Sequence, residues 1–370
     1  MHAHAAAVPR TAPPRLSALA AYLAVYVAFW TLIPLLLQQE PPIDNVEQLQ
    51  WALHPALGYA KHPPLPTLLL WLFERVLPAG IPLTYLLGAL QVSFTLGIAY
   101  ALGRASLDGR RARLGVLLIT CISYHTLRMH YYNHNTALLC ATAAAMYCTW
   151  RAVRGTGFGW WVALGVCWAA GMLSKYQMVL PIACNLLFAT LQLRARPAAL
   201  ISRLACATLV ALLLFSPHAL WLVRNDFPTF HYAADVLGDS LGFAARCDSL
   251  LRFAASQALR LLPAAVALAT LRRIAATHAT APAPPPPADS RRFWGIHAFG
   301  PLALMALMTL AGGVDLEMHW GTAFLWTLPL WYLSTPRGAV LANLPARTVL
   351  ILIAAVQLLL MGGKVLFPDA

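Results

Sequence analysis

Acidic, basic and imidazole side chains stand close together in one short segment, residues 44–65, between long apolar stretches. Asp44 and Glu47 are three residues apart, so on a helix their carboxylates share one face. Such a pair can abstract a proton, bind a divalent cation or hold a sugar hydroxyl, although each carboxylate could also be a solvated loop charge. Lys61 and His62 precede two prolines, which favour an extended backbone and a fixed position for the cation. We therefore expect this segment to act on an anionic group.

A second polar segment, residues 128–136, combines Arg128 with Asn133, His134 and Asn135. Side-chain amides are groups with which a binding site orients sugar hydroxyls. The two tyrosines of the segment have a simpler explanation, because aromatic residues are enriched at membrane–water interfaces. The remaining polar residues predict a site for a sugar or for an acceptor.

Other polar residues occur singly between apolar stretches. Lys175 lies in a short turn, where it either anchors a helix end or binds phosphate. Arg224 begins a loop of moderate length, and His319 and Trp320 open a late apolar stretch. His319 has no spaced partner of the kind that zinc sites use, and Trp320 is either an interfacial anchor or a face on which a sugar stacks. These positions add cations and a sugar-stacking face to the predicted site.

The elements that carry these residues are apolar. Of 370 residues, 60% are hydrophobic and 11% are charged, whereas soluble domains have about a quarter charged. The composition indicates an all-α polytopic membrane protein. A net charge of +13 is no evidence for nucleic-acid binding, because membrane proteins use basic residues to fix their orientation. The 7 cysteines lack a CxxC pair and predict neither disulfides nor a zinc site.

Apolar stretches of roughly 17 to 25 residues, with shorter ones where a helix is buried, predict about 11 membrane-spanning helices. The first follows residues 1–15 as an uncleaved span. Residues 65–77 are too short to cross and predict an interfacial helix in the first outer loop, residues 38–81. No soluble domain is expected after the last span. The predicted spans are residues 16–37, 82–103, 113–128, 135–151, 159–174, 176–193, 203–222, 252–271, 294–313, 320–335 and 347–363.

Charge alternates between the predicted loops. With a cytoplasmic N-terminus, every inner loop is rich in arginine, and of the 13 carboxylates only Asp108 and Asp289 lie inside. The polar segments described above then meet on the outer face. The Pro-rich residues 281–288 predict a flexible cytoplasmic linker. We therefore expect a catalytic module in residues 1–274, a linker in residues 275–293 and C-terminal helices in residues 294–370.

These motifs resemble those of bacterial membrane glycosyltransferases of the GT-C superfamily, in the branch related to protein mannosyltransferases and the aminoarabinose transferase of lipid A. The resemblance covers roughly residues 16–335. In chain order, the motifs are Asp44-Asn45, Leu57-Gly58-Tyr59, Lys61-His62-Pro63-Pro64-Leu65, residues 133–136, Leu173-Ser174-Lys175-Tyr176, Ser216-Pro217, Trp221, Asn225-Asp226 and His319-Trp320.

The resemblance implies an inverting transfer of a sugar from a polyprenyl-phosphate carrier to lipid A or lipopolysaccharide core, at the periplasmic side of a bacterial inner membrane. It implies that Asp44 assists the acceptor; Glu47 is the other candidate catalytic carboxylate, on the ground of its spacing from Asp44 alone. Family members commonly have Asp-Glu where this chain has Asp44-Asn45, which leaves a divalent cation open. The resemblance implies that donor phosphate is bound by Lys61, Lys175 and Arg224, and the position of His62 next to Lys61 adds it to that set. From the residue types we expect sugar or acceptor to be bound by Tyr59, Arg128, Asn133, His134, Asn135, His319 and Trp320.

Two other classes of function compete with a transferase. A transporter or flippase of a lipid-linked sugar would place ionisable residues along a path through the middle of the membrane, whereas here they gather at one side. A structural partner of an envelope complex would explain the spans but not the clustered carboxylates, lysines and amides. We therefore expect the transferase.

Overall fold

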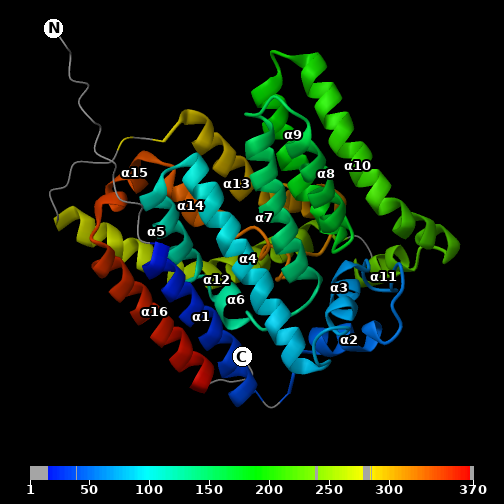
Figure 1. The fold of residues 1–370 in the computed structure, drawn as a ribbon, viewed down its shortest axis with the longest axis horizontal. Helices are drawn as coiled ribbons and strands as arrows, with labels where there is room; N and C mark the ends of the chain where they lie inside the picture. Colours follow the sequence, from blue (N-terminus) through cyan, green and yellow to red (C-terminus); the bar gives the residue numbers. More distant parts are fainter. Residues whose placement is uncertain (1–15, 39, 238–240, 278–283, 285, 367–370) are drawn as a thin grey trace, which may run out of the picture.

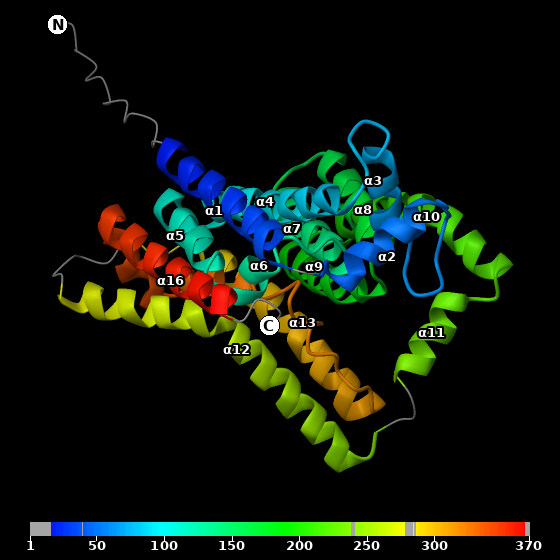
Figure 2. The same cartoon turned by 90° about the horizontal axis from the view of Figure 1, so that it is seen from below.

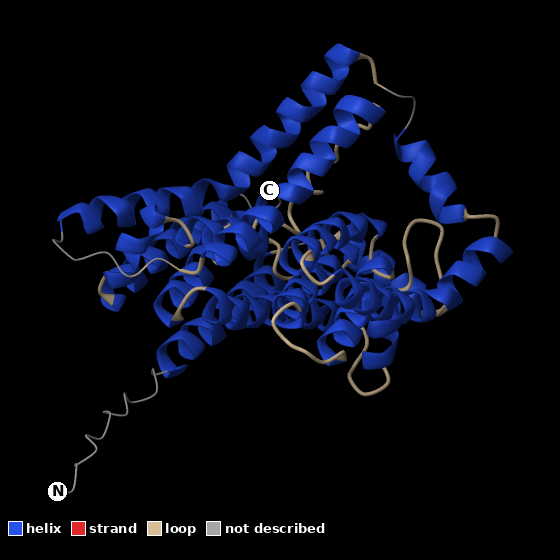
Figure 3. Ribbon diagram, turned by 90° about the horizontal axis from the view of Figure 1, so that it is seen from above, coloured by secondary structure: helices blue, strands red, loops and turns tan. Residues whose placement is uncertain are grey.

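The structure is a computed structural model and describes residues 16–38, 40–237, 241–277, 284 and 286–366. These residues form helices joined by loops (Figure 1), and no strand occurs among them (Figure 3). The predicted all-α class is confirmed. In chain order the helices are α1 Leu16–Leu37, α2 Ile43–Ala52, α3 Leu65–Phe73, α4 Ile81–Ser106, α5 Gly109–Ile119, α6 Ser123–Leu127, α7 His134–Ala152, α8 Gly159–Met172, η1 Tyr176–Met178, α9 Val179–Leu193, α10 Pro197–Arg224, α11 Pro228–Leu237, α12 Phe243–Thr277, α13 Ala288–Gly312, α14 Thr327–Leu333, α15 Pro336–Ala339, η2 Val340–Asn343 and α16 Ala346–Leu366.

Among the described residues, 7 helical segments are long and apolar enough to cross a membrane: α1, α4, η1 with α9, α10, α12, α13 and α16. They coincide with predicted spans. Helix α7, with 19 residues, and α8, with 14, correspond to two more. The predicted count of about 11 is not confirmed, because the predicted spans at residues 113–128 and 320–335 are not single helices.

The predicted span at residues 113–128 is interrupted after Ile119. The carbonyl oxygen of Thr120 accepts hydrogen bonds from Thr126 Oγ1 at 2.5 Å and from Gln357 Nε2 at 2.8 Å. An interruption in an apolar segment is tolerated where neighbouring side chains satisfy the freed backbone groups. One of these donors lies 237 residues further along the chain, so local apolarity could not reveal the break.

The predicted span at residues 320–335 is mostly turn, since only Thr327–Leu333 form an α-helix. Side chains of two other helical segments hold the preceding turns in place. Gln177 Nε2 donates to the carbonyl oxygen of Trp320 at 2.8 Å, and Gln257 Nε2 donates to that of Met318 at 2.8 Å. These bonds replace the regular helical bonds that the apolar composition predicts.

The first and last described helices, α1 and α16, lie side by side (Figures 1 and 2). Trp30 of α1 is buried, and its Nε1 donates to Gln357 Oε1 of α16 at 2.8 Å. Further inside, Phe188 of α9 contacts Phe293 of α13 with ring centroids 4.9 Å apart. Helices before and after the Pro-rich segment therefore share one apolar core.

The segment that joins α12 to α13 is shorter than the predicted linker, residues 275–293, because α12 continues to Thr277 and α13 begins at Ala288. Residues 278–283 and 285 lie outside the described residues. The division into a catalytic module and C-terminal helices stays a prediction.

Both carboxylates predicted on the arginine-rich side pair with arginine. Asp108 accepts from the buried Arg111 at 2.6 Å. Asp289, at the start of α13, forms an ion pair with Arg154 just beyond the end of α7. The two exceptions to the predicted charge segregation are therefore neutralised locally, and the orientation itself stays a prediction.

The predicted first outer loop contains two short helices, α2 and α3, that lie beside each other near α4 (Figure 2). A small apolar cluster joins them to the start of α4 and to Tyr132. Thr67 Oγ1 of α3 donates to Gln48 Oε1 of α2 at 2.8 Å, and both residues are buried. The predicted interfacial piece is thus helical over Leu65–Phe73, and its depth in the membrane stays a prediction.

Gly88 allows α4 to approach the backbone that leads to Asn133. A Cβ there would lie 2.6 Å from the carbonyl oxygen of Tyr131 and 2.9 Å from that of Met129. We expect Gly88→Ala to lower the free energy of unfolding by about 1–3 kcal/mol, the usual range for overpacking. Thermal melting of the detergent-purified chain measures this change. Gly97→Ala on the same helix is the matched control, because a Cβ there meets nothing within 4 Å; equal melting temperatures would contradict the prediction.

Candidate active site

Asp44 lies in the first turn of α2, and its neighbour Asn45 fixes that turn in place. Asn45 is fully buried; its Nδ2 donates to Thr84 Oγ1 at 2.8 Å and to the carbonyl oxygen of His130 at 2.9 Å. Its Oδ1 accepts from the backbone nitrogen of Tyr132 at 3.1 Å. A fully satisfied buried amide specifies one arrangement of the elements it joins. Asn45 therefore holds the carboxylate beside the start of α7.

Asn133 both caps α7 and binds Asp44. Its Oδ1 accepts from the backbone nitrogens of Asn135 at 2.9 Å and Thr136 at 3.1 Å, and the Thr136 side chain completes a capping box. Its Nδ2 donates to Asp44 Oδ2 at 2.6 Å. The amide is thus oriented by the helix end, and the carboxylate is oriented by the amide.

Lys175 lies in the turn between α8 and η1 and points toward the same helix end. Its Nζ donates to Asn135 Oδ1 at 2.7 Å and lies 5.8 Å from the ring centroid of Trp320. Burial lowers the pKa of its ammonium group to about 7, although Asp44 and Glu317 are close enough to favour the charged form. The predicted lysine and the first-loop carboxylate therefore belong to one cluster.

Three imidazoles surround this lysine. His62 lies against His134 with ring centroids 3.6 Å apart. Burial, reinforced by Lys175 and Lys61, lowers the pKa of His62 to about 3, and burial also lowers the pKa of His134 well below its usual value. Burial likewise lowers the pKa of His319 to about 3, with a further contribution from Lys175. At neutral pH these rings are uncharged, so they offer hydrogen bonds and not positive charge.

Glu47 and Lys61 pair with each other at 2.6 Å at the exposed rim of the cluster. The side chains are 22% and 43% exposed, respectively, and an exposed pair of this kind contributes little to stability. The hydrogen bond from Glu47 is the main cause that raises the pKa of Lys61. Lys61 also lies 6.0 Å from the ring centroid of Tyr232 on α11. This arrangement presents Glu47 as a partner of Lys61 more than as a second carboxylate beside Asp44.

Of the other predicted residues, one packs within its own loop and two have exposed side chains. The Tyr59 ring stacks on Trp51 with centroids 4.8 Å apart, and its hydroxyl accepts from the backbone nitrogen of Ala56 at 3.1 Å. Arg128 is exposed over Tyr131, 4.9 Å from the ring centroid. Arg224 is exposed at the end of α10, and no described contact joins it to the cluster. Of the predicted outer segments, the structure therefore brings four into one cluster, residues 44–62, 133–135, 175 and 319–320.

Sequence reasoning missed three residues of this region: Asn45, Tyr232 and Arg260. Asn45 appeared only as a departure from a family motif, and Tyr232 carries no local signal. Arg260 lies inside the predicted span at residues 252–271. An arginine inside an apolar span is itself a sign of function, so this residue could have been found.

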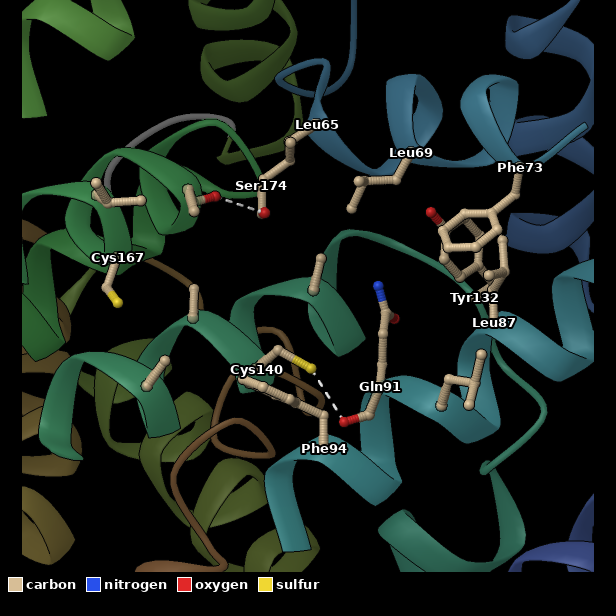
Figure 4. A pocket seen from close by; sticks show the side chains of 16 residues that line it. Leu65, Leu69, Phe73, Leu87, Gln91, Phe94, Tyr132, Cys140, Cys167 and Ser174 are labelled. Carbon is tan, nitrogen blue, oxygen red and sulfur yellow. Dashed lines mark hydrogen bonds between the residues drawn. The ribbon is translucent and has the colours of Figure 1, made fainter. Parts of the chain in front are cut away.

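A half-open groove of about 360 Å³ runs between α3, α4, α7 and α8. Figure 4 shows Leu69 and Phe73 on one wall, Gln91 and Phe94 on another, and Ser174 at one end. Its lining is almost wholly apolar. The backbone nitrogen of Leu65 donates to the carbonyl oxygen of Leu173 at 2.9 Å, which ties the start of α3 to the turn that carries Lys175. The groove therefore ends next to the lysine.

The open question of a divalent cation gains no support from the side chains in the described ranges. They include no group of three His, Cys, Asp or Glu residues that could hold a metal ion. Asp44 and Glu47 are each bound to a nitrogen donor.

Residues 61–221 match the family model described as dolichyl-phosphate-mannose-protein mannosyltransferase. Among curated proteins, the chain is 28% identical over 369 residues to the lipopolysaccharide core galacturonosyltransferase RgtA of Rhizobium johnstonii, covering 93% of this chain and 70% of that protein. It is 28% identical over 222 residues to RgtB of the same organism, a protein of the same description, covering 56% of this chain and 43% of RgtB. The predicted resemblance to membrane glycosyltransferases is confirmed.

The fold is that of ArnT from Cupriavidus metallidurans, whose crystal structure was solved bound to undecaprenyl phosphate. The TM-score is 0.66 at 16% identity, over 92% of this chain and 64% of that one. The apo structure of the same protein gives a TM-score of 0.64. The chain thus spans somewhat less than two thirds of the ArnT chain, and the likeness concerns the fold.

Proposed function

We propose that this chain is an inverting glycosyltransferase that moves a sugar from a polyprenyl-phosphate carrier to a glycolipid acceptor. One observation carries the proposal: Asp44 and Lys175 are held by two amides, two residues apart, at a single helix end, where an apolar groove ends. A carboxylate, a cation and an apolar groove are the parts that a lipid-linked phosphate sugar requires.

The donor would lie with its prenyl tail along the groove and its phosphate against Lys175. A prenyl chain is wholly apolar, so its burial against side chains such as Leu69 and Phe94 is favourable. The phosphate would offset the burial of the ammonium group and raise its pKa from about 7. Lys61 at the rim would add a second, more exposed cation. The undecaprenyl phosphate bound by ArnT is a ligand of the same chemical class.

In the proposed reaction, an acceptor oxygen attacks the anomeric carbon from the side opposite the phosphate, which inverts that centre. The bond between the anomeric carbon and the phosphate oxygen breaks, and its electron pair stays on the phosphate. Lys175 stabilises the charge that develops there. If the acceptor is a hydroxyl, Asp44 takes its proton; if it is a phosphate, which is already nucleophilic, Asp44 orients it.

The acceptor we propose is lipid A or lipopolysaccharide core, at the periplasmic face of a bacterial inner membrane. RgtA and RgtB are named for the lipopolysaccharide core, which favours an acceptor of this class. The arginine-rich loops on the opposite side support that orientation. A transporter or flippase is less well supported, because Asp44, Lys61 and Lys175 gather at one rim.

The direct test is transfer by the purified full chain in lipid nanodiscs. It would be given undecaprenyl phosphate carrying galacturonic acid, aminoarabinose or a hexose, together with lipid A or core-bearing lipid A. Mass spectrometry should show one sugar added to one acceptor and free undecaprenyl phosphate in equal amount. Movement of the carrier between leaflets without any sugar transfer would instead favour the flippase.

A further inference from the structure

Two arginines from distant parts of the chain meet over one aromatic ring. Arg128 follows α6, and Arg260 lies within α12. Each guanidinium carbon lies 5.6 Å from the ring centroid of Tyr124, and that of Arg128 is also 4.9 Å from the Tyr131 centroid. Ser123 Oγ donates to the carbonyl oxygen of Arg260 at 3.2 Å, which ties α6 to α12. The pair is therefore held by tertiary structure and is not an accident of one flexible loop.

Neither arginine has a carboxylate partner among the described residues. The Arg128 side chain makes no hydrogen bond with them, and the Arg260 guanidinium donates through one nitrogen only, to the carbonyl oxygen of Met318 and to Ser256 Oγ. Arg252 on the same helix is different, since it pairs with Asp248 at 3.0 Å and with Asp315 at 3.5 Å. Two like charges that repel each other and keep most of their donors unused are suited to an anion.

The pair adjoins the proposed reaction centre. Tyr124 is within electrostatic range of Asp44, and His319 is within range of Arg128, Arg260 and Lys175. Asn135, which holds Lys175, lines the same small pocket as Tyr124 and Arg128. A molecule bound at the arginines could therefore reach Asp44 while the donor occupies Lys175.

We propose that Arg128 and Arg260, held over Tyr124, bind an oxyanion of the acceptor headgroup. This inference rests on the proposed function, which supplies the reason for an anionic glycolipid to come to this face. A guanidinium binds phosphate or carboxylate through two parallel hydrogen bonds, a geometry that lysine does not offer. The two subsites have different roles. Lys175 binds the phosphate that leaves, and the arginine pair positions the acceptor that attacks.

The test measures binding by the full chain in phosphatidylcholine nanodiscs, with no turnover required. The probes are bisphosphorylated lipid A, dephosphorylated lipid A with a carboxylate core sugar, neutral dephosphorylated lipid A, and undecaprenyl phosphate. We expect the wild-type chain to bind at least one anionic glycolipid tenfold or more tighter than the neutral one. The anionic probe that binds better identifies the oxyanion. The Arg128→Gln, Arg260→Gln double variant should lose this preference and bind undecaprenyl phosphate within twofold of wild type.

Arg75→Gln is the matched control, because Arg75 is an exposed arginine of the first outer loop that lies over Trp71, 4.6 Å from the ring centroid. It should keep the preference. The inference is overturned if wild type binds all three glycolipids equally, if the double variant keeps the preference, or if the double variant loses undecaprenyl phosphate to the same degree. A chain that binds undecaprenyl phosphate but transfers no sugar would instead contradict the proposed function.

Discussion

Lys175→Met is expected to lower kcat/KM for the lipid-linked donor by about a hundredfold to a thousandfold, the usual effect of removing one preorganised group that stabilises transition-state charge. The methionine keeps an apolar stem of similar length, so the turn between α8 and η1 should persist. The Asn135 Oδ1 atom would lose its donor, which is a smaller effect. Steady-state kinetics with saturating acceptor measure the loss. Turnover within a factor of ten of wild type would remove Lys175 from the mechanism.

The pH dependence separates a charge effect from a packing effect. With a pKa of about 7, Lys175 is charged below that pH and loses its charge as pH rises through it. A lipid-linked phosphodiester keeps its single charge over this range, so donor affinity should fall from pH 6 to pH 8. Lys175→Arg stays charged throughout and should flatten the profile. Lys364→Gln on α16 is the control lysine, and it should keep both the rate and the pH profile.

Asp44→Asn is expected to lower kcat by about a hundredfold to ten-thousandfold if the acceptor is a hydroxyl, which is the usual contribution of a positioned general base. The amide oxygen of the new side chain can still accept from Asn133 Nδ2, so the start of α7 should be unchanged. The KM values should therefore stay near wild type. Initial rates at saturating donor and acceptor measure this effect.

Glu40→Gln is the matched control for Asp44, because Glu40 is an exposed carboxylate of the same outer loop. It should leave the rate unchanged. A loss below about tenfold in Asp44→Asn would mean that the acceptor attacks as an anion and that the carboxylate orients it. Full activity in Asp44→Asn would contradict any role of that carboxylate in the reaction.

The gathering of the polar segments could be predicted, because charged residues in a mostly apolar chain are restricted to its surfaces and loop charge fixes which surface. Asp44, Lys61, Asn133 and Lys175 come from segments up to 131 residues apart, and the observed cluster contains all of them. Composition likewise predicted helices, and the ordered motifs predicted the family resemblance. These features depend on residue type and order.

Features that depend on partners distant in sequence could not be predicted. The break at Thr120 requires Gln357, and the turns at Met318 and Trp320 require Gln257 and Gln177. An apolar stretch has the same composition whether it forms one helix or is interrupted by turns. Composition therefore predicts spans at residues 113–128 and 320–335, where the structure has turns. The exposure of Arg224 follows from where α10 ends, which hydropathy alone does not set.

Asn45 illustrates the same limit at the site. In the sequence, Asn45 stands where relatives have a second carboxylate, and it was noted only for that difference. In the fold it is the buried amide that joins α2 to Thr84, His130 and Tyr132. Its importance lies in three contacts with residues that are near only after folding. A carboxylate at this position would face two oxygen atoms with which the amide now bonds as a donor.

Asn133 caps α7 and Asn135 lies in its first turn, and the first holds Asp44 while the second holds Lys175. The spacing of the proposed reacting groups is thus a property of one rigid turn and not of the loops around it. Lengthening those loops, or changing their side chains, would alter which headgroup the site admits. The spacing of Asp44 and Lys175 would stay the same. Such a scaffold can diversify its substrates over evolutionary time without having to reinvent its chemistry.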